Sequence, residues 1–361
     1  MGGIILKKGY LYLSDGSYYE GNLYGEEKIK YGELVFNTSM TGYQEILTDP
    51  SYAKQIVILT YPFIGNYGIN DIYSESQNIF ASGLVVKNLE NTPSNFMSKN
   101  SLEEFANYKN LTILSDIDTR ALTIKIRDKG VMNSIISPKK LEENELKELF
   151  SKPLNIESSM TEVGVKEIIE IKGNKETIGV LDLGVKNNII ENLKKRDVNI
   201  KIFPYGTVAE DILAHKIDGL LVSNGPGDPK YATKAIECVK KLFGKLPIFG
   251  ICMGNQVISL AAGGDTYKMK FGHRGGNHGV IDYKNNRSFI TSQNHGYAVD
   301  EKSLENSGFE VAFRNLNDDT VEGIRHKDYP IFSVQFHPEA CPGPRDTEYL
   351  FDEFLKLVRG E

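Results

Sequence analysis

The second half of the chain alternates short apolar runs with segments of helical spacing. The apolar runs predict strands at 178–183, 198–203, 218–223, 248–251 and 331–336. Apolar residues three or four positions apart predict amphipathic helices at 187–196, 208–215 and 232–243. This order is typical of a parallel sheet with helices on both faces. In such sheets, binding sites lie beyond the carboxyl ends of the strands.

The first half of the chain is dominated by strand patterns. Residues 10–13 and 17–21 flank Ser14-Asp15-Gly16, which predicts a β-hairpin. Helices are few: one is expected to begin at Ser101, which forms a capping box with Glu104, and another spans 118–129. We therefore expect an α/β protein with a mixed, β-rich N-terminal α/β domain and a C-terminal open, mostly parallel α/β sheet with helices on both faces. The expected ranges are 1–150 for the first domain, 151–176 for a polar connector and 177–361 for the second domain.

Composition narrows the classes of protein that fit this pattern. The net charge of −6 argues against a nucleic-acid-binding surface. No apolar run approaches the roughly 20 residues of a membrane span, and the first eight residues lack the order of a signal peptide. The three cysteines are too few for a disulfide framework and indicate thiols in a reducing compartment. We expect a cytoplasmic protein.

The most informative segment is Gly-Ile-Cys-Met-Gly at 250–254. It follows an apolar run and precedes a helical pattern at 255–262, so it predicts a strand, a tight turn and a helix. Glycines on both sides of Cys252 leave room for a sharp turn, and the helix N-terminus favours a thiolate there. This is the arrangement of a nucleophile elbow with sulfur in place of oxygen. The alternative is that Cys252 is only a buried small side chain.

Two other loops are expected to meet the elbow above the sheet. His337-Pro338-Glu339 follows the strand at 331–336, and in an extended segment residues two apart project to the same side. Glu339 can then hold one nitrogen of His337 while the other faces the thiol. The loop at 224–229 contains two glycines and two prolines, and the N–H groups of Gly225 and Met253 could form an oxyanion hole. The alternatives are a structural histidine and a plain turn.

Some polar segments leave their role open. The stretch 37–52 has neither a strand nor a helix period, which suits a functional loop or a solvated connector. Segments 272–278 and 293–296 contain histidines, but no cysteine or carboxylate stands at the short spacings typical of zinc sites. We interpret both as shaped polar loops. Gly179 to Gly184 lacks the Gly-Lys-Ser/Thr ending of a phosphate loop, so no nucleotide site is expected.

Several motifs taken together resemble a known family. Gly-Ile-Cys-Met-Gly-Asn-Gln at 250–256, Ser-Asn-Gly-Pro-Gly-Asp-Pro at 223–229 and His-Pro-Glu at 337–339 resemble triad-type, class I glutamine amidotransferases over about 177–361. Further segments resemble the small subunit of carbamoyl-phosphate synthase. These segments are 36–52, 59–66, 116–120, 270–278, 293–297 and 338–344.

The resemblance implies a reaction and a set of site residues. Cys252 would attack glutamine, His337 would act as the base, Glu339 would orient it, and a glutamyl thioester would form. The residues implied for glutamine binding are Ser51, Gly225, Gly227, Met253, Gln256, Asn294, Gly296 and Tyr297. The resemblance implies no cofactor or metal in this chain. Ammonia would pass to a large synthetase subunit, which would hold ATP, a divalent metal and bicarbonate, for pyrimidine synthesis, arginine synthesis or both.

The chain departs from the family pattern at three positions, and three rival functions stay open. Met253, Asn255 and Tyr297 stand where the family often has leucine, histidine and phenylalanine. Asn255 leaves the triad intact, and its effect on the pocket wall stays open. The rivals are a glutaminase that feeds a different synthase, a catalytically silent regulatory scaffold, and a free-standing thiol hydrolase.

Overall fold

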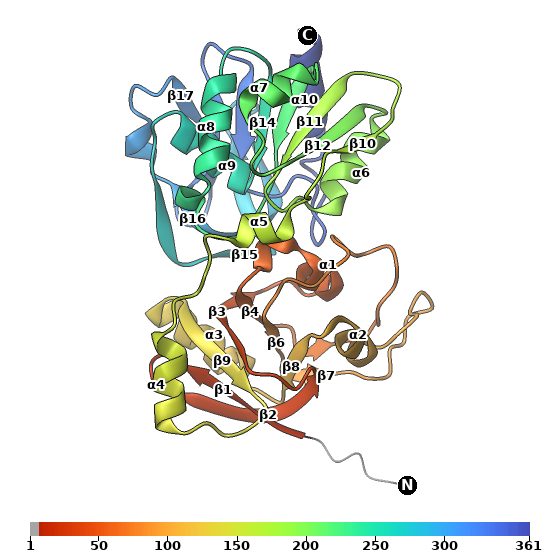
Figure 1. Cartoon of the computed structure of the whole chain (residues 1–361), viewed down its shortest axis with the longest axis vertical. Helices are drawn as coiled ribbons and strands as arrows, with labels where there is room; N and C mark the ends of the chain where they lie inside the picture. The colour runs from red at the N-terminus through yellow and green to blue at the C-terminus, as the bar shows by residue number, and fades with distance from the viewer. Residues whose placement is uncertain (1–6) are drawn as a thin grey trace. The chain divides into compact units, whose positions relative to one another are not determined.

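The computed structural model describes residues 7–361 and divides the chain into two compact units (Figure 1). The first unit ends at Asn155 and the second runs from Ile156 to Glu361. Each unit has its own sheet and its own buried core. Among the described residues, no helix is both long enough and apolar enough to cross a membrane.

The first unit is built around a closed barrel of seven strands. In order around the barrel, the strands are β1 (Lys7–Leu13), β2 (Tyr18–Gly25), β8 (Thr112–Ser115), β6 (Gly83–Val85), β4 (Gln55–Leu59), β3 (Lys30–Asn37) and β9 (Met132–Ser137). The predicted hairpin joins β1 to β2, and its turn depends on Gly16, which has φ 84°. β9 pairs with both β1 and β3 and so closes the barrel. The expected β-rich character is confirmed, whereas closure into a barrel was not predicted.

The helices of the first unit are α1 (Tyr43–Thr48), α2 (Leu102–Lys109), α3 (Thr119–Lys129) and α4 (Glu143–Ser151). Of these, α2 and α3 begin next to capping residues, whereas α1 has no side-chain cap at its start. The capping box of α2 is present, with Ser101 and Glu104 bonded reciprocally. A small pairing of β5 (Phe63–Ile64) with β7 (Asn88–Leu89) completes the unit.

The stretch 37–52 is more ordered than the sequence suggested. It contains α1 and a short 3₁₀ helix at Pro50–Tyr52, and most of the residues in these two elements are buried. The interpretation as a solvated connector is therefore wrong. The helical period was missed because α1 has only six residues, too few for periodicity to emerge.

The second unit is organised on a ten-stranded sheet. In order across the sheet, the strands are β10 (Ile169–Ile171), β12 (Asn199–Pro204), β11 (Thr177–Asp182), β13 (Gly219–Val222), β14 (Ile248–Ile251), β19 (Ile331–Val334), β18 (Val321–His326), β16 (Arg287–Val299), β15 (Thr266–Asp282) and β17 (Phe309–Asn315). β12, β11, β13, β14 and β19 are parallel to one another, as predicted. The remaining strands pair in antiparallel fashion. The expectation of a mostly parallel sheet is therefore corrected to a mixed sheet.

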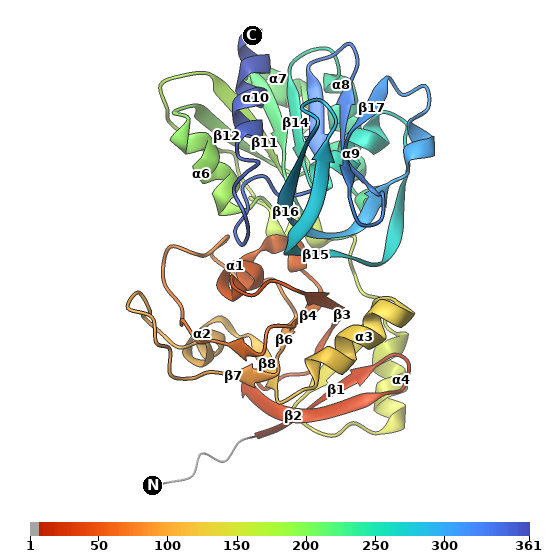
Figure 2. The same ribbon diagram turned by 180° about the vertical axis from the view of Figure 1, so that it is seen from behind.

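Helices cover both faces of the parallel strands, as the alternation of strands and helices along the chain predicts (Figures 1 and 2). The helices of this unit are α5 (Ser159–Val163), α6 (Asn187–Lys195), α7 (Ala209–Ala214), α8 (Thr233–Leu242), α9 (Met253–Ala261) and α10 (Tyr349–Arg359). Leu181 of β11 packs in a core with α7, α8 and α9, whereas its neighbour Val180 packs in a second core with α6 and α10. Successive residues of a strand point to opposite faces of the sheet and therefore pack in two separate cores.

The stretch expected to be a polar connector contributes to the second unit. Residues 159–163 form α5, and β10 pairs with β12 at the edge of the large sheet. The backbone N–H of Val165 donates to Asp182 at 2.8 Å, which ties this segment to the end of β11.

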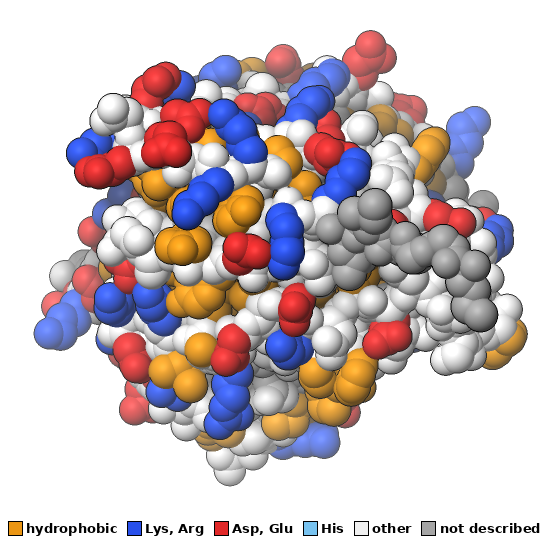
Figure 3. All heavy atoms as spheres, turned by 90° about the horizontal axis from the view of Figure 1, so that it is seen from below, with side chains coloured by type: hydrophobic (Ala, Val, Ile, Leu, Met, Phe, Trp, Pro, Cys, Tyr) orange, Lys and Arg blue, Asp and Glu red, His pale blue; other side chains and the backbone are white. Residues whose placement is uncertain are grey.

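The surface carries interspersed charges where it is visible in Figure 3. On that face, basic and acidic side chains alternate, and neither sign forms a continuous stripe. The expectation that the chain does not bind nucleic acid stays a prediction.

Candidate active site

Cys252 occupies the turn between β14 and α9, in a backbone conformation that few side chains adopt. Its φ is 55° and its ψ is −102°, and its N–H donates to the carbonyl oxygen of Val334 at 2.8 Å. A Cβ at Gly250 would lie 2.6 Å from a side chain of α9, and one at Gly254 would collide with the carbonyl oxygen of Val222. The predicted strand, turn and helix are confirmed. The turn holds the sulfur at the start of α9, where the helix dipole favours negative charge.

His337 and Glu339 follow β19 and lie in contact with each other. Nδ1 of His337 lies 2.7 Å from Oε1 of Glu339, and both residues are buried. The N–H of His337 donates to the carbonyl oxygen of Ser292 at 2.9 Å, which holds this loop against β16. Nε2 of His337 is buried and is left to interact with Cys252. One ring nitrogen is therefore held in place while the other remains available for proton transfer.

The charges around His337 favour its protonated form. Burial and the charge of Lys186 lower the pKa of His337, but the charge of Glu339 and a smaller effect of Cys252 raise the pKa above its usual range. The effect of Cys252 places the sulfur within interaction range of the ring. Burial raises the pKa of Glu339, whereas Lys186 and His337 together lower it to about 2. An imidazolium and a carboxylate therefore face each other at neutral pH.

Lys186 is a buried cation that the sequence analysis did not assign to the site. Its Nζ lies 3.0 Å from Oε1 of Glu339 and donates to the carbonyl oxygen of Ala340 at 2.7 Å. Lysine is rarely buried without a partner, so a lysine just after the buried strand β11 was a signal that we did not use. The contact ties the loop after β11 to the loop after β19.

Gly225 and Met253 follow two paired parallel strands, β13 and β14. Met253 is the first residue of α9, so its N–H has no partner within the helix. A Cβ at Gly225 would collide with the carbonyl oxygen of Leu183, so only glycine fits there. Gly225 and Met253 thus both lie at the carboxyl ends of neighbouring strands, on the side of the sheet where Cys252 lies. Their role as an oxyanion hole stays a prediction.

Residues expected to bind glutamine lie on segments that contact the elbow. The side-chain amide of Gln256 donates to the carbonyl oxygen of Tyr297 at 2.8 Å. The thiol of Cys252 lies 3.6 Å from the carbonyl oxygen of Asn294. These contacts join the start of α9 to β16, which also carries Gly296.

Gly227 and Ser51 lie on other segments. Gly227 belongs to the loop after β13 and has φ 91°, a conformation that favours glycine. Ser51 belongs to the first unit, where it is buried and its N–H donates to Asp49 at 2.9 Å. Their contribution to glutamine binding stays a prediction.

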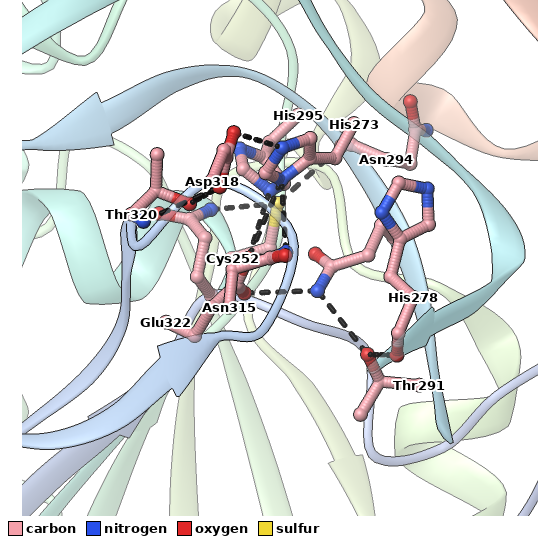
Figure 4. A network of polar contacts seen from close by, with 12 residues as sticks. Cys252, His273, His278, Thr291, Asn294, His295, Asn315, Asp318, Thr320 and Glu322 are labelled. Atoms are coloured by element: carbon pink, nitrogen blue, oxygen red, sulfur yellow. Dashed lines mark hydrogen bonds and ion pairs between the residues drawn. The ribbon is translucent and has the colours of Figure 1, made fainter. Parts of the chain in front are cut away.

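The histidine segments expected to be polar loops are strands. Residues 272–278 lie in β15 and residues 293–296 lie in β16, so that prediction is wrong. Strand periodicity was hidden because polar side chains on both strands are buried and pair with one another rather than facing water. Figure 4 shows this network beside Cys252.

His273 lies at the centre of the network. Its Nε2 lies 2.9 Å from Asp318, and its Nδ1 lies 3.3 Å from Glu322. Burial lowers the pKa of His273, but the two carboxylates outweigh burial and raise the pKa to about 9. Burial and the charge of His273 lower the pKa of His278 to about 4 and that of His295 well below its usual value. One imidazolium and two neutral imidazoles therefore share this space.

The network also contains atoms that are candidates for metal ligation. Among the described residues, His273, His295 and Glu322 place ligand atoms within 4.8 Å of one another. The carboxylate that is missing at short sequence spacing is thus supplied by a distant strand, β18. Glu322 already accepts hydrogen bonds from Asn315 at 2.8 Å and from Gln293 at 2.9 Å. These contacts support a brace between β15, β16 and β18, and the expectation of no metal stays a prediction.

Comparisons with known proteins assign the chain to a family. Residues 179–357 match the model for glutamine amidotransferase class-I, and residues 11–136 match that for the carbamoyl-phosphate synthase small chain, CPSase domain. The carbamoyl phosphate synthase small chain of Clostridium acetobutylicum is 52% identical over 350 residues, covering 97% of this chain and 100% of that protein. The chain belongs to the carbamoyl phosphate synthase small chain family.

Other members of the carbamoyl phosphate synthase small chain family match over nearly the whole chain. The protein of Staphylococcus saprophyticus is 46% identical, with 98% of this chain and 97% of that protein covered. The protein of Caldanaerobacter subterraneus is 48% identical, with 97% and 96% covered. The resemblance inferred from the motifs is confirmed, and so is the expectation of an enzyme of the glutamine amidotransferase class. The match over 11–136 argues against a glutaminase built for a different synthase.

We expect His273→Gln to destabilise the protein most below neutral pH. The pKa of about 9 in the folded state exceeds the ordinary value of 6.5, so the proton's stabilising effect is complete below about pH 6.5 and is lost as pH rises through about 9. Loss of the imidazolium leaves the carboxylates of Asp318 and Glu322 without their shared cation. We expect the free energy of unfolding to fall by about 3 kcal/mol near pH 6. Urea unfolding at a series of pH values measures the difference. His215→Gln, outside the network, is the control, and a difference that does not change with pH would contradict the prediction.

Proposed function

We propose that this chain hydrolyses glutamine for carbamoyl phosphate synthesis with Cys252, His337 and Glu339. The observation that carries the proposal is the 2.7 Å contact between His337 and Glu339, next to the elbow on the paired strand β14. A carboxylate-held imidazole near a thiol is the arrangement that activates cysteine for acyl transfer. Family membership supports glutamine as the substrate, because the second half is a class I glutamine amidotransferase domain.

The reaction follows from the positions of these groups. The thiolate of Cys252 attacks the carboxamide carbon, and the resulting oxyanion accepts hydrogen bonds from the N–H groups of Gly225 and Met253. The imidazolium of His337 gives its proton to the amide nitrogen, the C–N bond breaks, and ammonia leaves a glutamyl thioester. Neutral His337 then takes a proton from water, whose oxygen attacks the thioester. The C–S bond breaks, glutamate leaves, and the thiolate and the imidazolium are restored.

The contacts of Gln256 support a specific role in substrate binding. Its amide nitrogen donates to Tyr297 at 2.8 Å and to Gln335 at 3.1 Å, which uses both N–H bonds. The atom left to meet a ligand is Oε1, an acceptor that suits the ammonium group of glutamine. Donors for the substrate carboxylate and further contacts would come from Ser51, Gly225, Gly227, Met253, Asn294, Gly296 and Tyr297.

Lys186 would stabilise the ionised Glu339 throughout the cycle. Both Lys186 and His337 contact the same oxygen of Glu339. When His337 loses its proton, Lys186 remains as the counter-charge of the buried carboxylate. This arrangement keeps Glu339 as an acceptor for Nδ1 and so maintains the ring's orientation.

The ammonia would be used by a separate large subunit. The relatives are named small chains of carbamoyl phosphate synthase, and the name implies a larger partner. We propose that the partner holds ATP, a divalent metal and bicarbonate, and that the first unit of this chain contributes to binding it.

We expect Lys186→Met to slow glutamine hydrolysis and to change its pH dependence. The ammonium lowers the pKa of His337 and that of Glu339. Without it, His337 keeps its proton to higher pH, and the alkaline limb of the kcat/KM profile moves upward. Loss of the bond to Ala340 loosens the loop and lowers kcat by about 100-fold. Lys194→Met, at a half-exposed ion pair on α6, is the control, and an unshifted limb in Lys186→Met would refute this role.

The proposed function is tested by ammonia release from glutamine, with and without the large subunit, ATP and bicarbonate. We expect activity in the wild type, strong stimulation by the complete mixture, and loss of at least about 10³-fold in Cys252→Ala. Cys341→Ser, at a cysteine to which we assign no role, should keep activity. Equal rates in the wild type and Cys252→Ala would favour the silent scaffold. A fast rate that the mixture does not change would favour the free-standing hydrolase.

A further inference from the structure

Gln335 is a fully buried side chain that no step of the proposed reaction uses. It follows β19, and its backbone N–H donates to the carbonyl oxygen of Glu322 at 2.7 Å, which fixes it to β18. Its Oε1 accepts hydrogen bonds from Asn255 at 3.0 Å and from Gln256 at 3.1 Å. Its Nε2 lies 3.7 Å from the sulfur of Cys252. The amide therefore lies between the start of α9 and the nucleophile.

The neighbours of Gln335 determine which end of its amide faces the sulfur. The hydroxyl of Ser333 donates to Oδ1 of Asn255 at 2.8 Å, which leaves Nδ2 of Asn255 directed at Gln335. Gln256 directs a second N–H at the same end of the Gln335 amide. Only the oxygen of that amide can accept from two N–H groups, so the nitrogen must face Cys252.

We infer that Gln335 is a further catalytic residue, which donates an N–H to the sulfur of Cys252 and stabilises the thiolate. This inference rests on the proposed function, because the thiolate is the form that attacks the carboxamide. A hydrogen bond to an ionised acceptor is about twice as strong as one to a neutral acceptor. The contact therefore strengthens as charge develops on the sulfur, and it favours ionisation in a site from which water is largely excluded.

The same contacts assign a positioning role to Asn255, one of the departures from the family pattern. Asn255 is fully buried, and both ends of its amide are engaged, one by Ser333 and the other by Gln335. It acts on the sulfur through Gln335. The question that the sequence left open about Asn255 thus receives a proposed answer, which is a positioning role behind Cys252.

The substitution Gln335→Glu separates support of the helix from support of the thiolate. A carboxylate can still accept from Asn255 and Gln256, so those two contacts survive. The group that faces Cys252 changes from an N–H donor to an oxygen. The measurement is the rate at which iodoacetamide alkylates Cys252, read by peptide mass spectrometry as a function of pH and without glutamine. We expect the rate at neutral pH to fall by about tenfold or more and the midpoint of the rate curve to rise by about one pH unit.

Three further variants keep the test decisive. Asn192→Asp makes the same amide-to-carboxylate change at a buried site on α6 that contacts Arg196, and it should leave the alkylation curve unchanged. Ser333→Ala frees the Asn255 amide and should shift the curve in the same direction by less. Gln335→Met retains the side-chain size without the donor and replaces Gln335→Glu if the latter does not fold.

A wild-type alkylation curve in Gln335→Glu or Gln335→Met would overturn the inference, as would an equal shift in Asn192→Asp. The alkylation rate of Cys252 is measured without glutamine and does not depend on its turnover. If the wild type failed to hydrolyse glutamine while the Gln335 variants still shifted the curve, the proposed function would fall and the thiolate contact would stand.

Discussion

The turn at Cys252 is the constraint on which the rest of the second unit depends. A cysteine with positive φ is tolerated only where surrounding structure over-determines it. Here Gly250 lets the end of β14 approach α9, and Gly254 lets α9 approach β13. The hydrogen bond from Cys252 to β19 adds a further restraint. Because that bond goes to the strand that leads to His337, the backbone that strains the nucleophile also sets the position of its base.

The segment after β19 carries three of the polar side chains that lie around Cys252. Gln335, His337 and Glu339 are spaced two residues apart, and their contacts show them serving one site: the first meets the sulfur and the other two meet each other. The backbone bends at 335–336 and turns at 338–339, instead of continuing as the extended segment expected from the sequence. A single short stretch of irregular backbone thus delivers an amide, an imidazole and a carboxylate. The long strand β16 holds this stretch in place through Ser292, whose carbonyl oxygen accepts the N–H of His337.

The parts of the fold and of the site that could be predicted from sequence are those in which polar side chains face water and apolar side chains are buried. The strands and helices around the elbow were predictable because apolar side chains follow a period and glycines mark the turn. The β15–β16 hairpin was not, because His273, Gln293 and their neighbours are buried through mutual pairing, which breaks the usual link between polarity and exposure. Lys186 and Gln335 were missed for the same reason. Barrel closure depends on register between distant strands, which local patterns do not encode.

The sharing of Glu339 between Lys186 and His337 has a consequence for product release. With Cys252 as thiolate, the buried groups comprise two positive and two negative charges, so the resting site is electrically neutral. Glutamine is a zwitterion of zero net charge and enters without disturbing that balance. Glutamate carries one additional negative charge at the end of the side chain that faces the restored thiolate. Like charges repel strongly where water is scarce, so in the proposed reaction the hydrolysis of glutamine would itself favour release of the product.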